Sequence, residues 1–135
     1  MSIGLGGNCR LVAKDKDYLM FAYSSYDFNS ENREKAQNAF DGIITIHNDY
    51  FPKPAISKKK IKKPNGKKAW IEKRKYPDVN YEDFIKSGKI SVKNSSYASH
   101  FSENRIDRIA LDLIYKMNLK YQKSGQIPDE LSVFY

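Results

Sequence analysis

Hydrophobic side chains recur along the chain at two spacings, every second residue in some segments and every third or fourth residue in others. The shorter spacing indicates strands. Residues 9–14 and 18–26 are short apolar and aromatic runs separated by a polar turn. Residues 43–47, IITIH, are rich in β-branched side chains, and residues 89–93, KISVK, alternate apolar with polar positions. Such segments are typical of strands in an antiparallel sheet. Because residues 18–26 are apolar on both faces, we expect them to form a central strand covered on both sides.

The longer spacing indicates helices, and it is clearest from about 103 to 124. Apolar residues there recur at spacings of three and four, which places them on one face of a helix. Ser102 is the predicted N-cap of this helix, and Gly125 is its predicted stop. Residues 30–40 and 80–87 predict two shorter helices.

These elements predict an α+β fold in a single domain that spans residues 1–135. We expect a mainly antiparallel sheet of five to six strands, with the long C-terminal helix packed on one face and a basic β-hairpin that projects or forms an edge. The last residues, IPDELSVFY, are apolar enough to pack back onto the body. The glycines in IGLGGN, residues 3–8, lack the preceding strand and following helix of a phosphate-binding loop, so we interpret them as a flexible N-terminus.

Charge is concentrated in one segment. Residues 53–75 read KPAISKKKIKKPNGKKAWIEKRK and hold ten lysines, one arginine and one acid, Glu72, for a net charge of +10. The whole chain carries only +8, so the remaining residues are slightly acidic. A charge gathered in this way repels itself in the folded state and favours an anionic partner.

The basic segment predicts a β-hairpin over residues 53–76. Lys63-Pro64-Asn65-Gly66 suits a type I turn, because proline presets φ at the second position and glycine accepts the left-handed conformation at the fourth. With a glycine bulge, Ile61 faces Ala69, and Lys60 faces Trp70. This register gathers the aliphatic side chains on one face and most of the charge around Trp70 on the other.

The hairpin supplies the predicted partner-binding residues, and its composition leaves three interpretations open. Its lysines neutralise the phosphates of nucleic acid, dock on an acidic protein, or form a solvated arm. One arginine among ten lysines argues against base-specific readout, which favours the bidentate fork of arginine. The predicted site residues are Lys58, Lys59, Lys60, Lys62, Lys63, Lys67, Lys68, Trp70, Lys73 and Arg74.

Residues able to carry catalysis do not form a recognisable motif. Cys9 and His47 could be a nucleophile and its base, but both lie on predicted strands, and a buried cysteine is the favoured interpretation. His100 lies three residues before Glu103 in a serine-rich loop, and we interpret it as an ordinary loop histidine. The acids of the long helix, Asp107 among them, are interpreted as solvated charge. We therefore predict a protein that is not an enzyme and needs no metal or cofactor.

The function predicted from these features is stoichiometric binding of an acidic protein partner, in the manner of a bacterial immunity protein that inhibits a toxin. Sequence-tolerant binding of RNA or DNA through the same hairpin is the alternative. The chain start lacks the basic and apolar regions of a signal peptide, and no segment approaches the ~20 apolar residues of a membrane span. The sequence thus predicts a cytoplasmic protein with no membrane contact.

Overall fold

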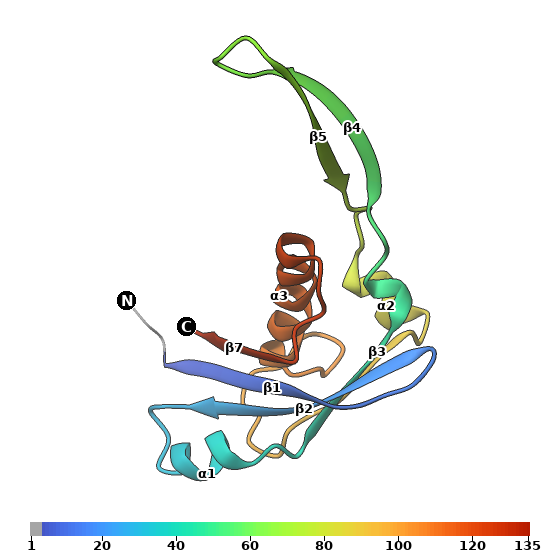
Figure 1. Cartoon of the computed structure of the whole chain (residues 1–135). Helices are drawn as coiled ribbons and strands as arrows, with labels where there is room; N and C mark the ends of the chain where they lie inside the picture. Colours follow the sequence, from blue (N-terminus) through green and yellow to red (C-terminus); the bar gives the residue numbers. More distant parts are fainter. Residues whose placement is uncertain (1–3) are drawn as a thin grey trace.

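The computed structural model describes residues 4–135 and has the predicted α+β fold (Figure 1). Five strands form one antiparallel sheet in the order β6-β3-β2-β1-β7, and β4 and β5 form a separate two-stranded sheet. The strands are β1 (Leu5–Lys14), β2 (Tyr18–Asp27), β3 (Gly42–His47), β4 (Ala55–Lys62), β5 (Lys68–Lys75), β6 (Ile90–Lys93) and β7 (Glu130–Phe134). The helices are α1 (Arg33–Asn38), the 3₁₀ turn η1 (Asn48–Tyr50), α2 (Tyr81–Lys86) and α3 (Arg108–Ser124).

The core lies between α3 and one face of the five-stranded sheet. Strand pairing sets Cys9 opposite Tyr23 and Ile44 opposite Phe21, so these side chains point to the same face. The C-terminal tail confirms the expected packing, because it pairs with β1 as the edge strand β7. The buried face of α3 consists of Ile109, Ala110, Leu113, Ile114, Met117, Asn118 and Tyr121.

The opposite face of the sheet is only partly covered, so the expectation for residues 18–26 is wrong over part of its length. Tyr18 and Met20 in the first half of β2 are each 38% exposed. In the second half, Ser24 and Tyr26 are buried, and α1 contacts this strand. Helix α1 has only six residues and is too small to cover the whole sheet. The first half of β2 is therefore exposed to solvent on this face.

Gly6 and Gly7 are part of the sheet, which corrects the predicted flexible terminus from Leu5 onward, and Ile3 lies outside the described residues. Gly6 and Gly7 lie in β1, between β2 on one side and β7 on the other. A Cβ atom on Gly7 would lie 2.3 Å from the Ile109 side chain. Glycine at this position therefore allows α3 to approach the sheet closely. The sequence does not reveal this role of Gly7, because the residue that it contacts lies about a hundred positions away in the chain.

Helix α3 begins later than predicted, because its N-cap is Asp107 and not Ser102. One carboxylate oxygen of Asp107 accepts the Ile109 N–H at 3.0 Å, and the other accepts the Tyr23 hydroxyl at 3.0 Å. Arg105 has a φ of +61°, which interrupts any helix before this point. Asp107 is fully buried, so the interpretation as solvated charge is also wrong. The predicted end at Gly125 is confirmed by its left-handed conformation.

The two shorter helices differ in how closely their bounds agree with the prediction. The side chain of Asn80 caps α2 by accepting the Glu82 N–H, close to the predicted start. Helix α1 is shorter than the predicted 30–40, because it begins after its N-cap Asn32 and ends before its C-cap Ala39. A Cβ atom on Gly42 would lie 2.1 Å from the ring of Tyr23. This glycine thus makes room for the buried tyrosine.

Candidate functional site

The basic segment forms the predicted hairpin, which is here called the arm and comprises residues 55–75. Its register is confirmed, with Ile61 opposite Ala69 and Lys60 opposite Trp70. The Gly66 N–H donates to the Lys63 carbonyl oxygen at 2.9 Å, and Gly66 has a φ of +82°. These are the bonding and conformation expected of a type I turn with a glycine bulge. All the determinants of this register are local in sequence.

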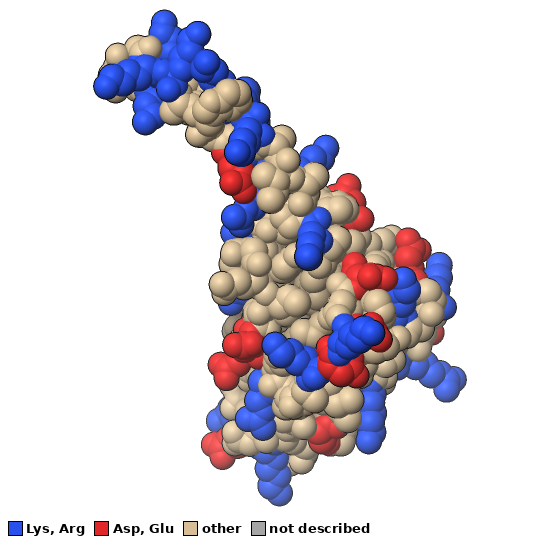
Figure 2. Space-filling model, turned by 45° about the vertical axis from the view of Figure 1, so that its right-hand side comes forward, with Lys and Arg blue, Asp and Glu red and all other residues tan. Residues whose placement is uncertain are grey.

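The arm projects away from the sheet and α3, and its tip is surrounded by solvent (Figure 1). Every predicted partner-binding residue is exposed, and the Trp70 side chain is 66% exposed. Between Lys58 and Ile71 the chain carries seven lysines and no acid. Lysine and arginine cover the distal part of the arm in the space-filling view (Figure 2). The positive charge of the chain is thus concentrated where it is most accessible.

The cations lie on both faces of the arm, because successive side chains of a strand alternate between faces. One face holds Lys58, Lys60, Lys62, Lys68, Trp70, Glu72 and Arg74, and the other holds Lys59, Ile61, Ala69, Ile71 and Lys73. Lys60 lies over the Trp70 ring, with its Nζ atom 5.8 Å from the ring centroid. The first face therefore combines most of the predicted cations with the exposed indole.

Tyr121 of α3 fixes the root of the arm to the body. Its hydroxyl donates to the Pro52 carbonyl oxygen at 2.9 Å, three residues before β4. Its ring packs edge-on against Tyr76, which directly follows β5, with ring centroids 5.3 Å apart. A second edge-on contact joins Tyr121 to Phe51, with ring centroids 5.4 Å apart. One side chain of α3 therefore holds both strands of the arm, a role that the sequence does not indicate.

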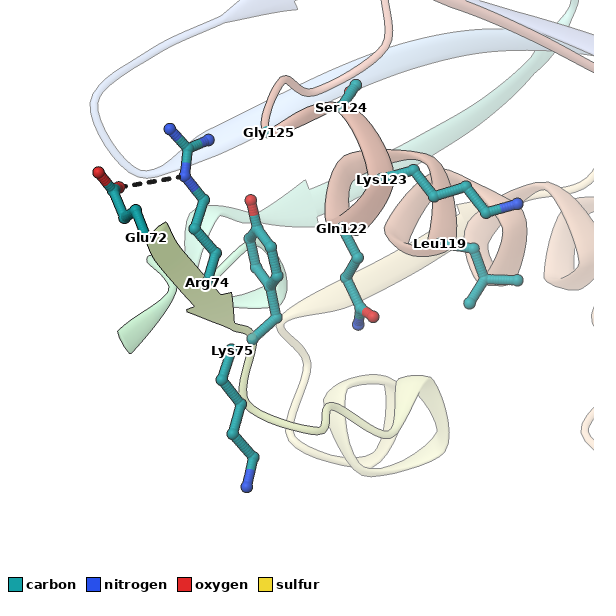
Figure 3. Close-up of a pocket in the computed structure, with 9 residues that line it drawn as sticks. Glu72, Arg74, Lys75, Leu119, Gln122, Lys123, Ser124 and Gly125 are labelled. Atoms are coloured by element: carbon teal, nitrogen blue, oxygen red, sulfur yellow. Dashed lines mark ion pairs between the residues drawn. The ribbon is translucent and has the colours of Figure 1, made fainter. Parts of the chain in front are cut away.

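Two hollows run from the arm to the C-terminal end of α3. The first, of about 530 Å³, is lined by Lys58, Trp70, Ile71 and Glu72. The second, of about 780 Å³, lies between the root of β5 and the last turn of α3 (Figure 3). Glu72 lines both hollows, and together they are here called the crook. The residues that line the second hollow are Glu72, Arg74, Lys75, Tyr76, Leu119, Gln122, Lys123, Ser124 and Gly125.

Charge in the crook is mixed but mainly positive. The Arg74 Nε atom lies 3.6 Å from a carboxylate oxygen of Glu72, the only acid of the arm. Both side chains of this ion pair are about half exposed, at 58% and 47%. Gly125 accommodates the arginine, because a Cβ atom there would lie 3.3 Å from one of its terminal nitrogens. Arg74 therefore lies at the point where the arm meets the end of α3.

The sequence-based catalytic candidates are not brought together. Cys9 faces the core opposite Tyr23, whereas His47 pairs with Tyr18 on the other face of the sheet. Burial raises the pKa of the Cys9 thiol to about 12, which keeps it protonated at neutral pH. The Nδ1 atom of His100 lies 2.8 Å from the Ser99 hydroxyl. A cysteine and a histidine on opposite faces of one sheet cannot act as nucleophile and base.

The described residues hold neither a candidate metal site nor a candidate membrane-spanning helix. Within residues 4–135, no three or more His, Cys, Asp or Glu side chains gather in a way that could hold a metal ion. Over the same residues, no helix combines the length and apolar character needed to cross a membrane. Comparisons with models of protein families, with curated proteins and with solved structures find no match.

Proposed function

We propose that this chain is a non-catalytic binding protein that associates stoichiometrically with an acidic protein partner, as immunity proteins and other inhibitors do when they occlude their targets. The observation that carries the proposal is the arm, where seven lysines without an acid lie on a projecting ribbon. The rest of the chain is slightly acidic. Positive charge concentrated in this way does not stabilise the folded chain, because the lysines repel one another. An anionic partner would neutralise that charge on binding.

The arm supports both stages of such an association. Its field steers an acidic surface toward the protein and raises the rate of encounter, an effect that salt screens. Trp70 then supplies an apolar side chain of the kind that dominates binding energy at protein interfaces. At 66% exposure, the indole has most of its surface still available for burial.

Affinity capture with matched variants tests the proposal. The arm variant replaces Lys58, Lys59, Lys60, Lys62 and Lys63 with serine, and the control replaces Lys14, Lys16, Lys35, Lys93 and Lys120, which are exposed on the body. Wild type and control should capture from the source cells one acidic protein that reassembles with the purified chain at equimolar ratio. The arm variant should lose it. The proposal fails if no such protein is recovered, or if the arm variant retains it as well as the control does.

Nucleic-acid binding is the second candidate, and one observation favours it. Cations lie on both faces of the arm and at its tip, as a ribbon needs if it is to meet phosphates on both walls of a groove. The major groove of DNA admits a two-stranded ribbon, and lysine contacts with phosphate require no base sequence. The test is titration of labelled single-stranded and duplex oligonucleotides at rising salt. Absence of binding at about 50 mM salt, where phosphate contacts are strongest, would exclude this candidate.

A further inference from the structure

We infer that the crook is the docking site for an acidic segment of the protein partner, one whose carboxylates alternate with apolar side chains. This inference rests on the proposed function and makes it more specific. The arm as a whole attracts an acidic partner, and the crook is the place where that partner would be held. Three properties of the crook support this inference: its shape, its chemistry and its rigidity.

The shape of the crook is concave, and it is formed by parts of the chain distant in sequence. In Figure 1 the arm curves toward the side of the molecule on which the C-terminal end of α3 lies. The two hollows, of about 530 and 780 Å³, have the size of sites that accept several side chains. A segment bound there would contact β5 and α3 together. Lys59 and Lys73, which lie on the other face of the arm, line neither hollow.

The chemistry of the crook combines cations with apolar and aromatic surface. Lys58, Arg74 and Lys123 can pair with carboxylates, and Trp70 and Leu119 offer exposed apolar surface. Tryptophan, tyrosine and arginine are the residues most enriched where protein interfaces gain their affinity. All three types occur here, because Tyr76 lines the second hollow. An occupant with carboxylates alone would leave the indole exposed, so the complementary segment also carries apolar side chains.

The ion pair between Arg74 and Glu72 gives the site a means of selection. Both groups are about half exposed, so solvent screens their attraction and the pair breaks at small cost. A carboxylate of the bound segment can then replace Glu72 as the ion-pair partner of Arg74, whose planar guanidinium suits bidentate pairing. Glu72 meanwhile repels occupants whose acids are wrongly placed. A single acid within a basic surface thus fixes the position of the bound segment.

The walls of the crook are held in place before any partner binds. Tyr121 contacts Tyr76 and hydrogen-bonds to Pro52, so the root of the arm cannot swing freely relative to α3. A site that is already ordered loses less conformational entropy on binding than a flexible arm does. This is the physical reason to expect tighter binding in the crook than along the rest of the arm.

Two synthetic peptides test the inference, one of repeated Glu-Leu units and one in which serine replaces leucine. Trp70 is the only tryptophan of the chain, so its fluorescence reports on binding beside the indole that lines the first hollow of the crook. The leucine peptide, titrated at low salt, should shift the emission to shorter wavelength and bind roughly tenfold more tightly than the serine peptide. Absence of binding, or equal affinity for the two peptides, would overturn the inference.

Charge removal from the two faces of the arm supplies the matched control. Lys58→Ser with Arg74→Ser removes two cations from the crook, and Lys59→Ser with Lys73→Ser removes two from the opposite face. The first variant should bind the leucine peptide roughly tenfold more weakly than the second. Equal weakening by both variants would mean that the arm attracts acids without a preferred face. That result would overturn the crook as the docking site and would leave the proposed function standing. A fluorescence change with duplex DNA and not with the peptide would also overturn it.

Discussion

The hydroxyl of Tyr121 donates a hydrogen bond to the carbonyl oxygen of Pro52 at 2.9 Å, and this bond joins α3 to the chain just before the arm. The two residues are 69 positions apart in sequence. The ring of the same tyrosine also packs on Tyr76 at the other root of the arm. The direction in which the basic arm projects is therefore set by a helix of the body.

The substitution Tyr121→Phe should lower the free energy of unfolding by about 1 kcal/mol, because it leaves the Pro52 carbonyl without its donor and keeps the ring contacts. Urea unfolding followed by circular dichroism measures the change. The control is Tyr115→Phe, whose side chain is 52% exposed and which should change stability by less than ~0.5 kcal/mol. Equal effects of the two substitutions would show that the hydroxyl of Tyr121 does not stabilise the arm root.

Removal of the arm should leave the body folded. Ala55 and Lys75 are paired across the two strands, so an Asn-Gly turn can replace residues 56–74 without moving the roots. The core between α3 and the five-stranded sheet includes none of the replaced residues. We expect cooperative unfolding with a free energy within ~1 kcal/mol of the full chain, measured with urea. Loss of cooperative unfolding would show that the arm is part of the folding unit.

Asp107 should make stability depend on pH in the direction opposite to most aspartates. Burial raises the pKa of its carboxyl, and the hydrogen bonds from Ile109 and Tyr23 oppose this effect only in part. A carboxyl whose pKa is higher in the folded chain binds protons more strongly there. Its contribution to stability is complete below the ordinary aspartate pKa and is lost as pH rises through the raised value.

The variant Asp107→Asn isolates this effect, since asparagine is neutral at every pH and is also a good N-cap. The free energy of unfolding of the wild type, minus that of the variant, should fall as pH rises from the ordinary aspartate pKa. Urea unfolding at a series of pH values measures the difference. A difference that rises with pH would mean that the buried carboxylate is stabilised in its charged form.

Cys9 should not react with thiol reagents in the folded protein. The side chain is 2% exposed, and burial raises the pKa of its thiol to about 12, so little thiolate exists at pH 8. Incubation with a coloured disulfide reagent at pH 8 should label the chain only after urea is added. Complete labelling within minutes in native buffer would contradict the buried position of Cys9 in β1.

Elements that depend on neighbouring residues could be predicted from the sequence. The register of the arm follows from Lys63-Pro64-Asn65-Gly66, because a turn of that composition leaves one favourable pairing of the adjacent strands. The end of α3 follows from Gly125 in the same way, since glycine takes the left-handed conformation without strain. The alternation of apolar residues gave the sheet and the packed face of the long helix.

Tertiary structure alone decided the features that join distant residues. Asp107 caps α3 because Tyr23, 84 positions away, occupies its second carboxylate oxygen, and no local pattern distinguishes it from a solvated acid. Residue 7, which lies in β1, has to be glycine because the Ile109 side chain occupies the space that a Cβ atom would fill. The crook exists only because Tyr121 holds the arm beside α3. Contacts between side chains far apart in the chain depend on the assembled fold, whereas turns and caps depend on neighbours, and this is why the arm was predictable and the crook was not.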